Sequence, residues 1–495
     1  MTRTLSLPVL AHPSRLHAPA VPPEKKEKCA VFGVWGHPHA ARISYLGLYA
    51  LQHRGQESVG IATSDGARLQ IHKGIGYVAD NFSEETFARL SGTSAIGHVR
   101  YSTAGESGIK NAQPILIDCA HGEIAIGHNG NIVNAQDLRD VLVSQGSIFQ
   151  TTSDTEVILH LMARNPRGEL VESLMRALAE VEGAFSLLLI GESAVVAARD
   201  PNGIRPLWMG ELDGKKCFAS ETCAFDLLGA KPLRELDHGE VVVVRDGEAT
   251  SFRLERKGSP RRCIFEHVYF ARPDSNVFSR SVMASRREMG RLLAKRHPVA
   301  ADLVVPVPDS GVSAALGYAE ASGIPFDFGM IRNHYVGRTF IEPTQQIRAL
   351  GVKLKHNANR AHIEGKRVIL VDDSIVRGTT SMKIVEMVRG AGAREVHMRI
   401  AAPPTSDPCF YGIDTPERDK LLASRYDVAG MAKFIGVDSL AFLSIDGLYR
   451  AMGLPGRDPA NPTFCDACFT GDYPIALDDV LGVEDRQLSL LVESA

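Results

Sequence analysis

The stretch VILVDDSIVRGTT, residues 368–380, decides the fold of the second half of this 495-residue chain. Val368–Val371 is a continuous apolar run, typical of a buried parallel strand. The residues from Thr380 onward have the apolar spacing of a helix that ends in Gly. A turn between a strand and a helix offers backbone N–H groups and the positive end of the helix dipole to a phosphate. The stretch therefore predicts an α/β unit with a parallel sheet and a phosphate site.

The side chains of this turn suit a sugar phosphate. Two carboxylates at the end of the strand can accept hydrogen bonds from ribose hydroxyls or orient a hydrated Mg²⁺. The turn resembles the phosphoribosyl pyrophosphate (PRPP) signature of type I phosphoribosyltransferases. The resemblance implies PRPP contacts from Asp372, Asp373, Ser374, Arg377, Gly378, Thr379 and Thr380. An ordinary strand, acidic turn and helix is the structural alternative.

Two further segments extend this expected site. VVPVPDSGVSAALGYAEASG, residues 304–323, again has the pattern strand, turn, helix, and it resembles the pyrophosphate loop of the same family. Ser310 and Gly311 would then face the pyrophosphate, and Ser310 would join Asp372 and Asp373 around Mg²⁺; pure packing is the alternative. The long polar stretch 332–357 is interpreted as a loop that closes over PRPP. It contributes Tyr335, and it carries His334 where relatives usually have Arg.

At the other end of the chain, the segment KEKCAVFGVWG (26–36) changes abruptly from charged to apolar at Cys29. Residues 1–28 have no sustained periodicity and are predicted to be a propeptide. Cleavage after Lys28 would leave Cys29 as an N-terminal nucleophile whose α-amino group, with a pKa of about 8, serves as its base. An organelle transit peptide is the alternative, because no acidic residue precedes Glu24.

Four short segments follow that resemble, together, the glutaminase domain of class II glutamine amidotransferases: QHRGQES (52–58), GHVRYST (97–103), GHNGNIVN (127–134) and SDTEV (153–157). The resemblance implies an N-terminal nucleophile (Ntn) hydrolase fold with αββα layers.

The same resemblance assigns roles around Cys29. Arg100 would hold the α-carboxylate of glutamine as a bidentate fork, and Asp154 would take the α-ammonium group. Asn129 and the backbone N–H of Gly130 would form the oxyanion hole. Arg54 and Thr103 would complete the glutamine site. Taken singly, an Arg after a strand is more often part of a surface ion pair.

Length and composition agree with two catalytic domains. A net charge of −3 without basic runs argues against nucleic acid as a partner. No stretch approaches the roughly 18 apolar residues of a membrane span, so a cytoplasmic enzyme is expected. The polar stretch RLERKGSPRR (253–262) is the expected boundary. The predicted division is a propeptide (1–28), a glutaminase domain (29–260), a phosphoribosyltransferase domain (261–475) and a C-terminal tail (476–495).

The chain has eight cysteines, which in the cytoplasm are more often thiols or ligands than disulfides. Cys465 and Cys468 form a CDAC pair, and Cys263 and Cys409 are available as partners. Spacing alone leaves zinc, an iron–sulfur cluster and metal-free thiols open. The contexts RRCIFEH, PCFYGID and CDACFTG, with the leader, resemble the iron–sulfur type of glutamine PRPP amidotransferases. That resemblance implies one [4Fe–4S] cluster per subunit on these four cysteines.

This family resemblance also implies a reaction. The chain would be a pentosyltransferase and glutamine amidotransferase that converts glutamine, PRPP and water to 5-phosphoribosylamine, glutamate and diphosphate, the first committed step of purine (IMP) biosynthesis. Ammonia would pass from the Cys29 site to the PRPP site, where one Mg²⁺ per subunit would hold the diphosphate. The resemblance further implies a homotetramer inhibited by AMP, GMP, ADP or GDP.

Two other classes of protein compete with this interpretation. A hexosamine-forming amidotransferase would keep the glutaminase and change the acceptor, but residues 368–380 argue against it. A nucleotide-sensing regulator with an inactive transferase domain would lack the nucleophile at Cys29 and would carry a basic DNA-binding surface.

Overall fold

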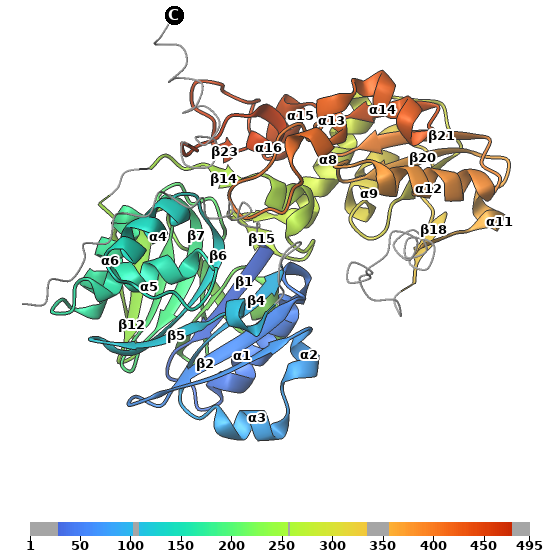
Figure 1. Ribbon diagram of the computed structural model, residues 1–495. Helices are drawn as coiled ribbons and strands as arrows, with labels where there is room; N and C mark the ends of the chain where they lie inside the picture. Colours follow the sequence, from blue (N-terminus) through green and yellow to red (C-terminus); the bar gives the residue numbers. More distant parts are fainter. Residues whose placement is uncertain (1–27, 102–107, 256–257, 334–355, 478–495) are drawn as a thin grey trace, which may run out of the picture.

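The computed structural model describes residues 28–101, 108–255, 258–333 and 356–477 (Figure 1). The predicted residues Thr103, His334 and Tyr335 lie outside these ranges. So do most of the predicted propeptide and most of the predicted C-terminal tail.

The first half of the chain builds two antiparallel sheets. The first sheet has the strand order β11-β9-β10-β1-β4-β2-β3. Its strands are β1 (Lys28–Val34), β2 (Ser58–Ser64), β3 (Leu69–Ile75), β4 (Ser94–Tyr101), β9 (Trp208–Leu212), β10 (Lys215–Ala219) and β11 (Lys231–Glu235). The second sheet has the order β13-β12-β8-β7-β6-β5. Its strands are β5 (Ile115–Cys119), β6 (Gly122–Ile132), β7 (Gly183–Ile190), β8 (Val195–Arg199), β12 (Glu240–Arg245) and β13 (Glu248–Arg253).

Helices cover the outer face of each sheet. On the first sheet lie α1 (Ala40–Ala50) and α7 (Cys223–Leu228), and on the second α4 (Ala135–Ser144), α5 (Thr155–Ala163) and α6 (Leu170–Glu180). A separate apolar cluster, with Val31 and Leu188 among its members, fills the space between the sheets. The alternation of buried side chains along each strand therefore supplies both the inner and the outer cores. The predicted αββα layering is confirmed.

This half also contains four short helical elements. They are η1 (Gln52–Arg54), α2 (Val78–Asn81), α3 (Glu84–Arg89) and η2 (Ile109–Asn111).

The second half is built on a four-stranded parallel sheet with the order β17-β20-β21-β22. Its strands are β17 (Leu303–Pro306), β20 (Arg367–Asp372), β21 (Glu395–Ile400) and β22 (Ser439–Phe442). Helices α12 (Thr379–Gly390) and α14 (Val428–Ile435) pack on one face, and α8 (Val282–Arg296), α9 (Val312–Ser322) and α15 (Ile445–Ala451) contribute to the core on the other. The expected parallel sheet and the helix after the 368–380 turn are confirmed.

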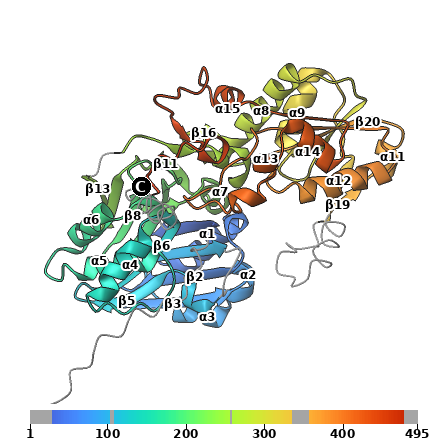
Figure 2. The ribbon, with the colours of Figure 1, turned by 45° about the horizontal axis from the view of Figure 1, so that its top comes forward.

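Shorter elements complete this half: β14 (Arg262–Cys263), η3 (Glu266–Phe270), β15 (Asn276–Val277), β16 (Arg280–Ser281), β18 (Met330–Arg332), β19 (His356–Ala358), α11 (Arg360–Ile363), η5 (Arg418–Lys420), α13 (Leu422–Arg425), β23 (Phe464–Cys465) and α16 (Ala467–Thr470). In Figures 1 and 2, α4, α5 and α6 lie at one end of the molecule and α11 and α12 at the other.

The two halves share one continuous apolar cluster. Val133, Ala184 and Ile204 of the first half pack in it together with residues of η3, α8 and the C-terminal segment. The stretch 253–262, expected to be a boundary, runs from the last residue of β13 to the first residue of β14. No helix in the described ranges has the length and apolarity to span a bilayer.

Candidate active sites

Strand β1 carries Cys29 in a fully buried position next to β4. Cys29 is the direct partner of Arg100 in the antiparallel β1/β4 pair. Because side chains alternate along a strand, Cys29 lies on the same face as Val31, whose side chain is in the layer between the two sheets. Val31 lies against Gly127 of β6. The thiol therefore faces the sheet that carries the GHNG segment.

Asn129 and Gly130 lie on β6, as the oxyanion-hole prediction requires. Asn129 is completely buried, and within the described part of the chain neither its side-chain oxygen nor its side-chain nitrogen has a hydrogen-bond partner. Gly130 has φ of +155°, and a Cβ there would lie 1.9 Å from the carbonyl oxygen of Ala184. A buried amide without partners is costly, so Asn129 has the character of a group reserved for a ligand.

Arg100 and Asp154 are both nearly buried, and both have protein partners. The Nη1 atom of Arg100 donates to Glu57 over 3.0 Å. Asp154 accepts a hydrogen bond of 2.8 Å from the backbone N–H of Ile132, and its carboxylate lies 3.7 Å from Nδ1 of His128. Burial acts to raise the pKa of Asp154, but His128 and the hydrogen bonds outweigh it and the pKa is lowered. The carboxylate is therefore ionised at neutral pH and suits a cationic ligand group.

Arg54, in contrast, contacts protein groups deep inside the molecule. Its Nε donates to the carbonyl oxygen of Cys29 over 3.1 Å, and its other nitrogens donate to Glu221 and Glu266. Its side chain is fully buried. These contacts fit a supporting role better than direct contact with glutamine.

At the predicted PRPP turn, the two carboxylates meet where β20 ends. Asp372 and Asp373 are less than a tenth exposed, and the Oγ of Ser374 donates to Asp373. Burial, followed by the neighbouring Asp373, raises the pKa of Asp372 well above its usual value. Two adjacent buried carboxylates that resist joint ionisation would be relieved by a cation.

The rest of the turn leads into the first residues of α12. Gly378 has φ of +75°, and a Cβ there would lie 2.7 Å from Cδ2 of Leu422, so both conformation and space favour glycine. Arg377, Thr379 and Thr380 are exposed beside it. The helix start and these exposed side chains are thus placed beside one another, where the predicted phosphate site would need them.

The 307–311 loop lies next to this cradle, because β17 and β20 are neighbours in the parallel sheet. The Ser310 side chain lies close enough to Asp372 to oppose the rise in the pKa of that carboxyl group. A Cβ on Gly311 would lie 2.3 Å from the carbonyl oxygen of Val371, so only glycine permits this approach. The fold thus brings together Ser310, Gly311 and the two aspartates.

Comparison with known proteins decides the family. A glutamine amidotransferase domain model matches residues 98–227. The chain is 57% identical over 476 residues to the amidophosphoribosyltransferase of Rhizobium etli, covering 94% of this chain and 96% of the relative. It is 48% identical to the Bacillus subtilis enzyme of that name, over 90% of this chain and 94% of the relative.

A solved structure of the Bacillus subtilis glutamine PRPP amidotransferase, complexed with ADP and GMP, matches with a TM-score of 0.85 and 47% identity. The match covers 91% of this chain and 98% of that chain. The chain belongs to the amidophosphoribosyltransferase family.

As an amidophosphoribosyltransferase, the chain is an enzyme of the glutamine amidotransferase and pentosyltransferase classes that acts at the first step of purine biosynthesis. The function expected from the sequence is confirmed. The Ntn-type half corresponds to the glutamine amidotransferase class, and the parallel-sheet half corresponds to the pentosyltransferase class.

The four cysteines predicted to hold a cluster come from three separate segments of this amidophosphoribosyltransferase. Cys263 and Cys465 are register partners in the parallel β14/β23 pair, and both belong to one apolar cluster with Cys468, against which Cys409 packs. Burial raises the pKa of Cys263 to about 12. Four thiolate donors suit an iron–sulfur cluster. The described residues include no group of three or more His, Cys, Asp or Glu side chains arranged to hold a metal ion.

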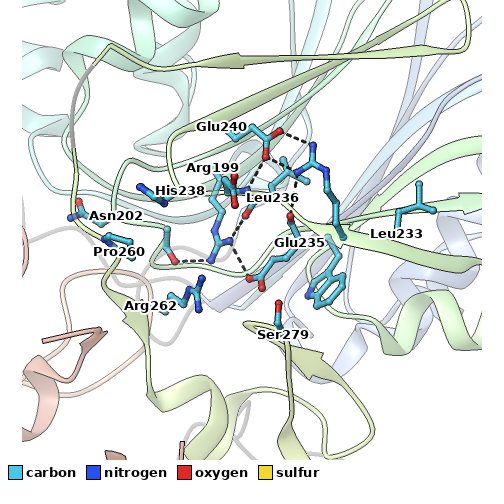
Figure 3. Close-up of a pocket in the computed structure, with 14 residues that line it drawn as sticks. Arg199, Asn202, Leu233, Glu235, Leu236, His238, Glu240, Pro260, Arg262 and Ser279 are labelled. Atoms are coloured by element: carbon cyan, nitrogen blue, oxygen red, sulfur yellow. Dashed lines mark hydrogen bonds and ion pairs between the residues drawn. The ribbon is translucent and has the colours of Figure 1, made fainter. Parts of the chain in front are cut away.

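A pocket of about 590 Å³ lies elsewhere in the amidophosphoribosyltransferase, between the loops after β8 and β11 and the start of the second half (Figure 3). Arg199, Glu235 and Arg262 are among its lining residues. None of the described lining residues was predicted to bind glutamine or PRPP. Each of the three side-chain nitrogens of Arg199 already donates to a protein group, namely the carbonyl oxygens of Arg205, Leu236 and Gly203.

Sequence reasoning missed several residues of the glutaminase site. Glu57 and Glu266 lie inside segments that were quoted for other residues, QHRGQES and RRCIFEH, yet no role was assigned to either. His128 also went unnoticed, although it precedes Asn129 and lies beside Asp154. Their positions inside the quoted motifs could have marked these residues as candidates. Only the fold shows which buried cation each carboxylate contacts.

Proposed function

We propose that the glutaminase reaction takes place at Cys29. The buried amide of Asn129 carries this proposal, because it lies on the strand that the thiol faces and makes no hydrogen bond with the described residues. Arg100 binds the α-carboxylate of glutamine, Asp154 binds its α-ammonium group, and Thr103 and Arg54 support them. The pKa of Asp154 is lowered, which keeps that carboxylate charged for its task.

The chemistry at this site follows from the placement. The thiolate of Cys29 attacks the side-chain carbonyl carbon of glutamine, while Asn129 and the N–H of Gly130 donate to the developing oxyanion. Such preorganised donors are each worth roughly 3 to 4 kcal/mol in the transition state. The C–N bond breaks, ammonia leaves with a proton relayed from the α-amino group, and water hydrolyses the thioester to glutamate. This sequence requires removal of residues 1–28 as a propeptide.

The second partial reaction takes place at the end of the parallel sheet. Residues 374–380 hold the 5-phosphate of PRPP, Asp372 and Asp373 hold the ribose, and Ser310 and Gly311 face the pyrophosphate, with Arg377 and Tyr335 as further contacts. Ser310, Asp372 and Asp373 would hold Mg²⁺, which would supply charge neutralisation for the leaving diphosphate. Positioning and charge stabilisation provide most of the rate enhancement, so no general base is required here.

Ammonia passes between the two sites inside the protein. Contacts between the halves support this: the side chain of Asn131, two residues after Asn129, donates to the carbonyl oxygen of Phe410 over 2.9 Å. A Cβ on Gly412 would lie 3.1 Å from Gly130. The strand that carries Asn129 and the 409–412 loop of the second half are therefore in direct contact, as an internal route for ammonia requires.

Further features of the enzyme belong to this proposal. Cys263, Cys409, Cys465 and Cys468 hold one [4Fe–4S] cluster, which suits their sulfur-only donor set. The domains comprise residues 29–260 and 261–475, followed by a tail. Purine nucleotides inhibit, as ADP and GMP bound to the Bacillus subtilis enzyme support. The enzyme is a cytoplasmic homotetramer.

Two variants test the division of labour. Cys29→Ala is expected to abolish product formation from glutamine and to leave product formation from ammonia intact. Asp372→Asn is expected to reduce both. If Cys29→Ala retained glutamine-dependent activity, the nucleophile assignment would be wrong.

A further inference from the structure

Four charged side chains form a buried cluster between strand β1 and the beginning of the second half of the chain. Arg54, Arg205, Glu221 and Glu266 are each 0% exposed. Three of them belong to the first half, whereas Glu266 begins the π-helical turn η3. Burying charges is expensive unless each is paired, so their arrangement calls for an explanation.

Arg54 is the centre of this cluster and touches the nucleophile's own backbone. Its Nε donates to the carbonyl oxygen of Cys29 over 3.1 Å, and its Nη1 and Nη2 donate to the two oxygens of Glu266 over 2.9 and 2.8 Å. The ring of Phe270 lies 4.1 Å from the guanidinium carbon. Glu266 binds both Nη groups, and Glu221 also accepts from Nη1, so these carboxylates orient the guanidinium and hence the Nε–H that holds Cys29.

Glu266 and Glu221 both accept from Nη1 of Arg54, but their other partners differ. Glu221 also binds His53, Ser275 and the backbone N–H of Arg272, so it anchors the surrounding loops. Among the described residues, the Glu266 carboxylate instead pairs only with cations: Arg54, and Arg205 over 3.2 Å. Burial acts to lower the pKa of Arg54, but the two carboxylates outweigh it and the pKa is raised. Arg54 therefore stays charged.

We propose that Glu266 is a positioning residue for the glutaminase nucleophile, acting through Arg54 on the carbonyl group of Cys29. This inference rests on the proposed role of Cys29. Residue 266 belongs to the second half, 212 positions after Arg54 in the chain. The glutaminase half thus takes from its neighbour a residue that completes its own site, and the segment 29–260 alone lacks it.

The test compares Glu266→Gln with wild-type holoenzyme in glutamine-dependent and ammonia-dependent assays. Gln cannot accept from both Nη groups of Arg54, so the hold on Cys29 loosens. The kcat with glutamine is expected to fall about 10- to 100-fold, as for a misplaced catalytic group. The KM for glutamine and the ammonia-dependent kcat stay within about twofold, because the substrate contacts and the PRPP site are untouched.

A matched control is available in Glu240, drawn in Figure 3. It is a buried carboxylate that likewise accepts from both Nη groups of one arginine, Arg234, over 2.8 and 2.7 Å. Its other partners in the described part of the chain are the backbone N–H of Asp237 and the hydroxyl of Ser251, so it does not bind Cys29. Glu240→Gln should leave all three kinetic constants unchanged.

Arg54→Lys is the second variant, for the case that Glu266→Gln does not fold. Lys keeps the positive charge, but its single ammonium group cannot bind the carbonyl oxygen of Cys29 and both oxygens of Glu266 at once. We therefore expect the same decrease in kcat at an unchanged KM for glutamine. A raised KM at unchanged kcat would show that Arg54 contacts glutamine, and would overturn the proposal. Equal loss with glutamine and ammonia, or no loss, would also overturn it. Cys29→Ala, assayed in parallel, tests the nucleophile separately. Glutamine-dependent activity that persisted in Cys29→Ala would contradict the nucleophile assignment, whatever the Glu266 variant does.

Discussion

Cys29 and Arg100 are direct partners across the antiparallel β1/β4 pair. The Cα atoms of such partners are about 4.5 to 5.5 Å apart, so the proposed nucleophile and the proposed carboxylate fork are set by one strand pairing. The strand register, and not a flexible loop, therefore fixes the distance between the two protein groups that contact opposite ends of glutamine.

Replacing the fork tests this relationship. In Arg100→Lys the charge remains but the planar pair of donors is lost. The KM for glutamine is expected to rise about 10- to 100-fold, equivalent to roughly 1.4 to 2.8 kcal/mol of binding, and kcat should change little. Steady-state kinetics with glutamine give the answer, and the ammonia-dependent reaction is the internal control. An unchanged KM would exclude Arg100 from the glutamine site.

Asn129 should affect catalysis without supporting the fold. Asn129→Ala removes one oxyanion donor, so the glutamine-dependent kcat is expected to fall about 10²- to 10³-fold. Because both polar atoms of the buried amide lack partners, their removal should leave the melting temperature equal or higher. Kinetics and a thermal melt measure both effects. A marked drop in melting temperature would mean that the amide has a structural role.

The charge of Asp372 is expected to support activity and, at the same time, to lower the stability of the ligand-free protein. Burial and the adjacent Asp373 raise its pKa above 3.8 in the folded protein, so folding takes up a proton as the pH rises past 3.8 and stability falls. Asp372→Asn cannot ionise, and at neutral pH without ligands it should melt at a higher temperature than wild type, although PRPP-dependent activity is lost.

The matched control for that experiment is Asp302→Asn. Asp302 lies in the same half, but its hydrogen bonds to Arg367 lower its pKa. Removing that charge should not raise the melting temperature. If Asp372→Asn melted below wild type at neutral pH without ligands, the relief of charge repulsion would be refuted.

Two buried histidines predict acid sensitivity. Burial lowers the pKa of His98 and of His267 to about 3. Between pH 6.5 and that value the unfolded chain binds their protons and the folded chain does not, so stability is complete above pH 6.5 and is lost as the pH falls. Each contributes a slope of up to about 1.4 kcal/mol per pH unit.

Denaturant midpoints as a function of pH measure this slope. His267→Gln can still donate to the carbonyl oxygen of Val277, the partner of His267 in the wild type. It should remove about half of the slope that the two histidines contribute together, because the contribution of His98 remains. An identical slope in variant and wild type would show that His267 is not held neutral.

Much of the fold was predictable because its signals are local. The apolar run that ends in Asp372 became β20, and Thr379 begins α12 as the turn chemistry indicated. The strand that begins near Cys29 is equally plain in the sequence. Local apolar runs and glycine turns determine such elements, whatever the rest of the chain does.

The contacts between distant segments were not predictable in this way. Nothing near Glu266 in the sequence indicates that it meets Arg54, since the pair is created by packing the two halves together. Glu57 beside Arg100 has the same origin, because β2 and β4 become neighbours only in the sheet. A charged residue in a motif is most often solvated, and its burial emerges only from the tertiary structure.

The most direct test of the central claim is to follow glutamate and diphosphate in one reaction of anaerobically purified enzyme with glutamine, with and without Mg-PRPP. Equimolar glutamate and diphosphate that appear together only when PRPP is present are the predicted result. Glutamate released at the same rate without PRPP, and no diphosphate with it, would contradict the coupling of the Cys29 site to the site at Asp372 and Asp373.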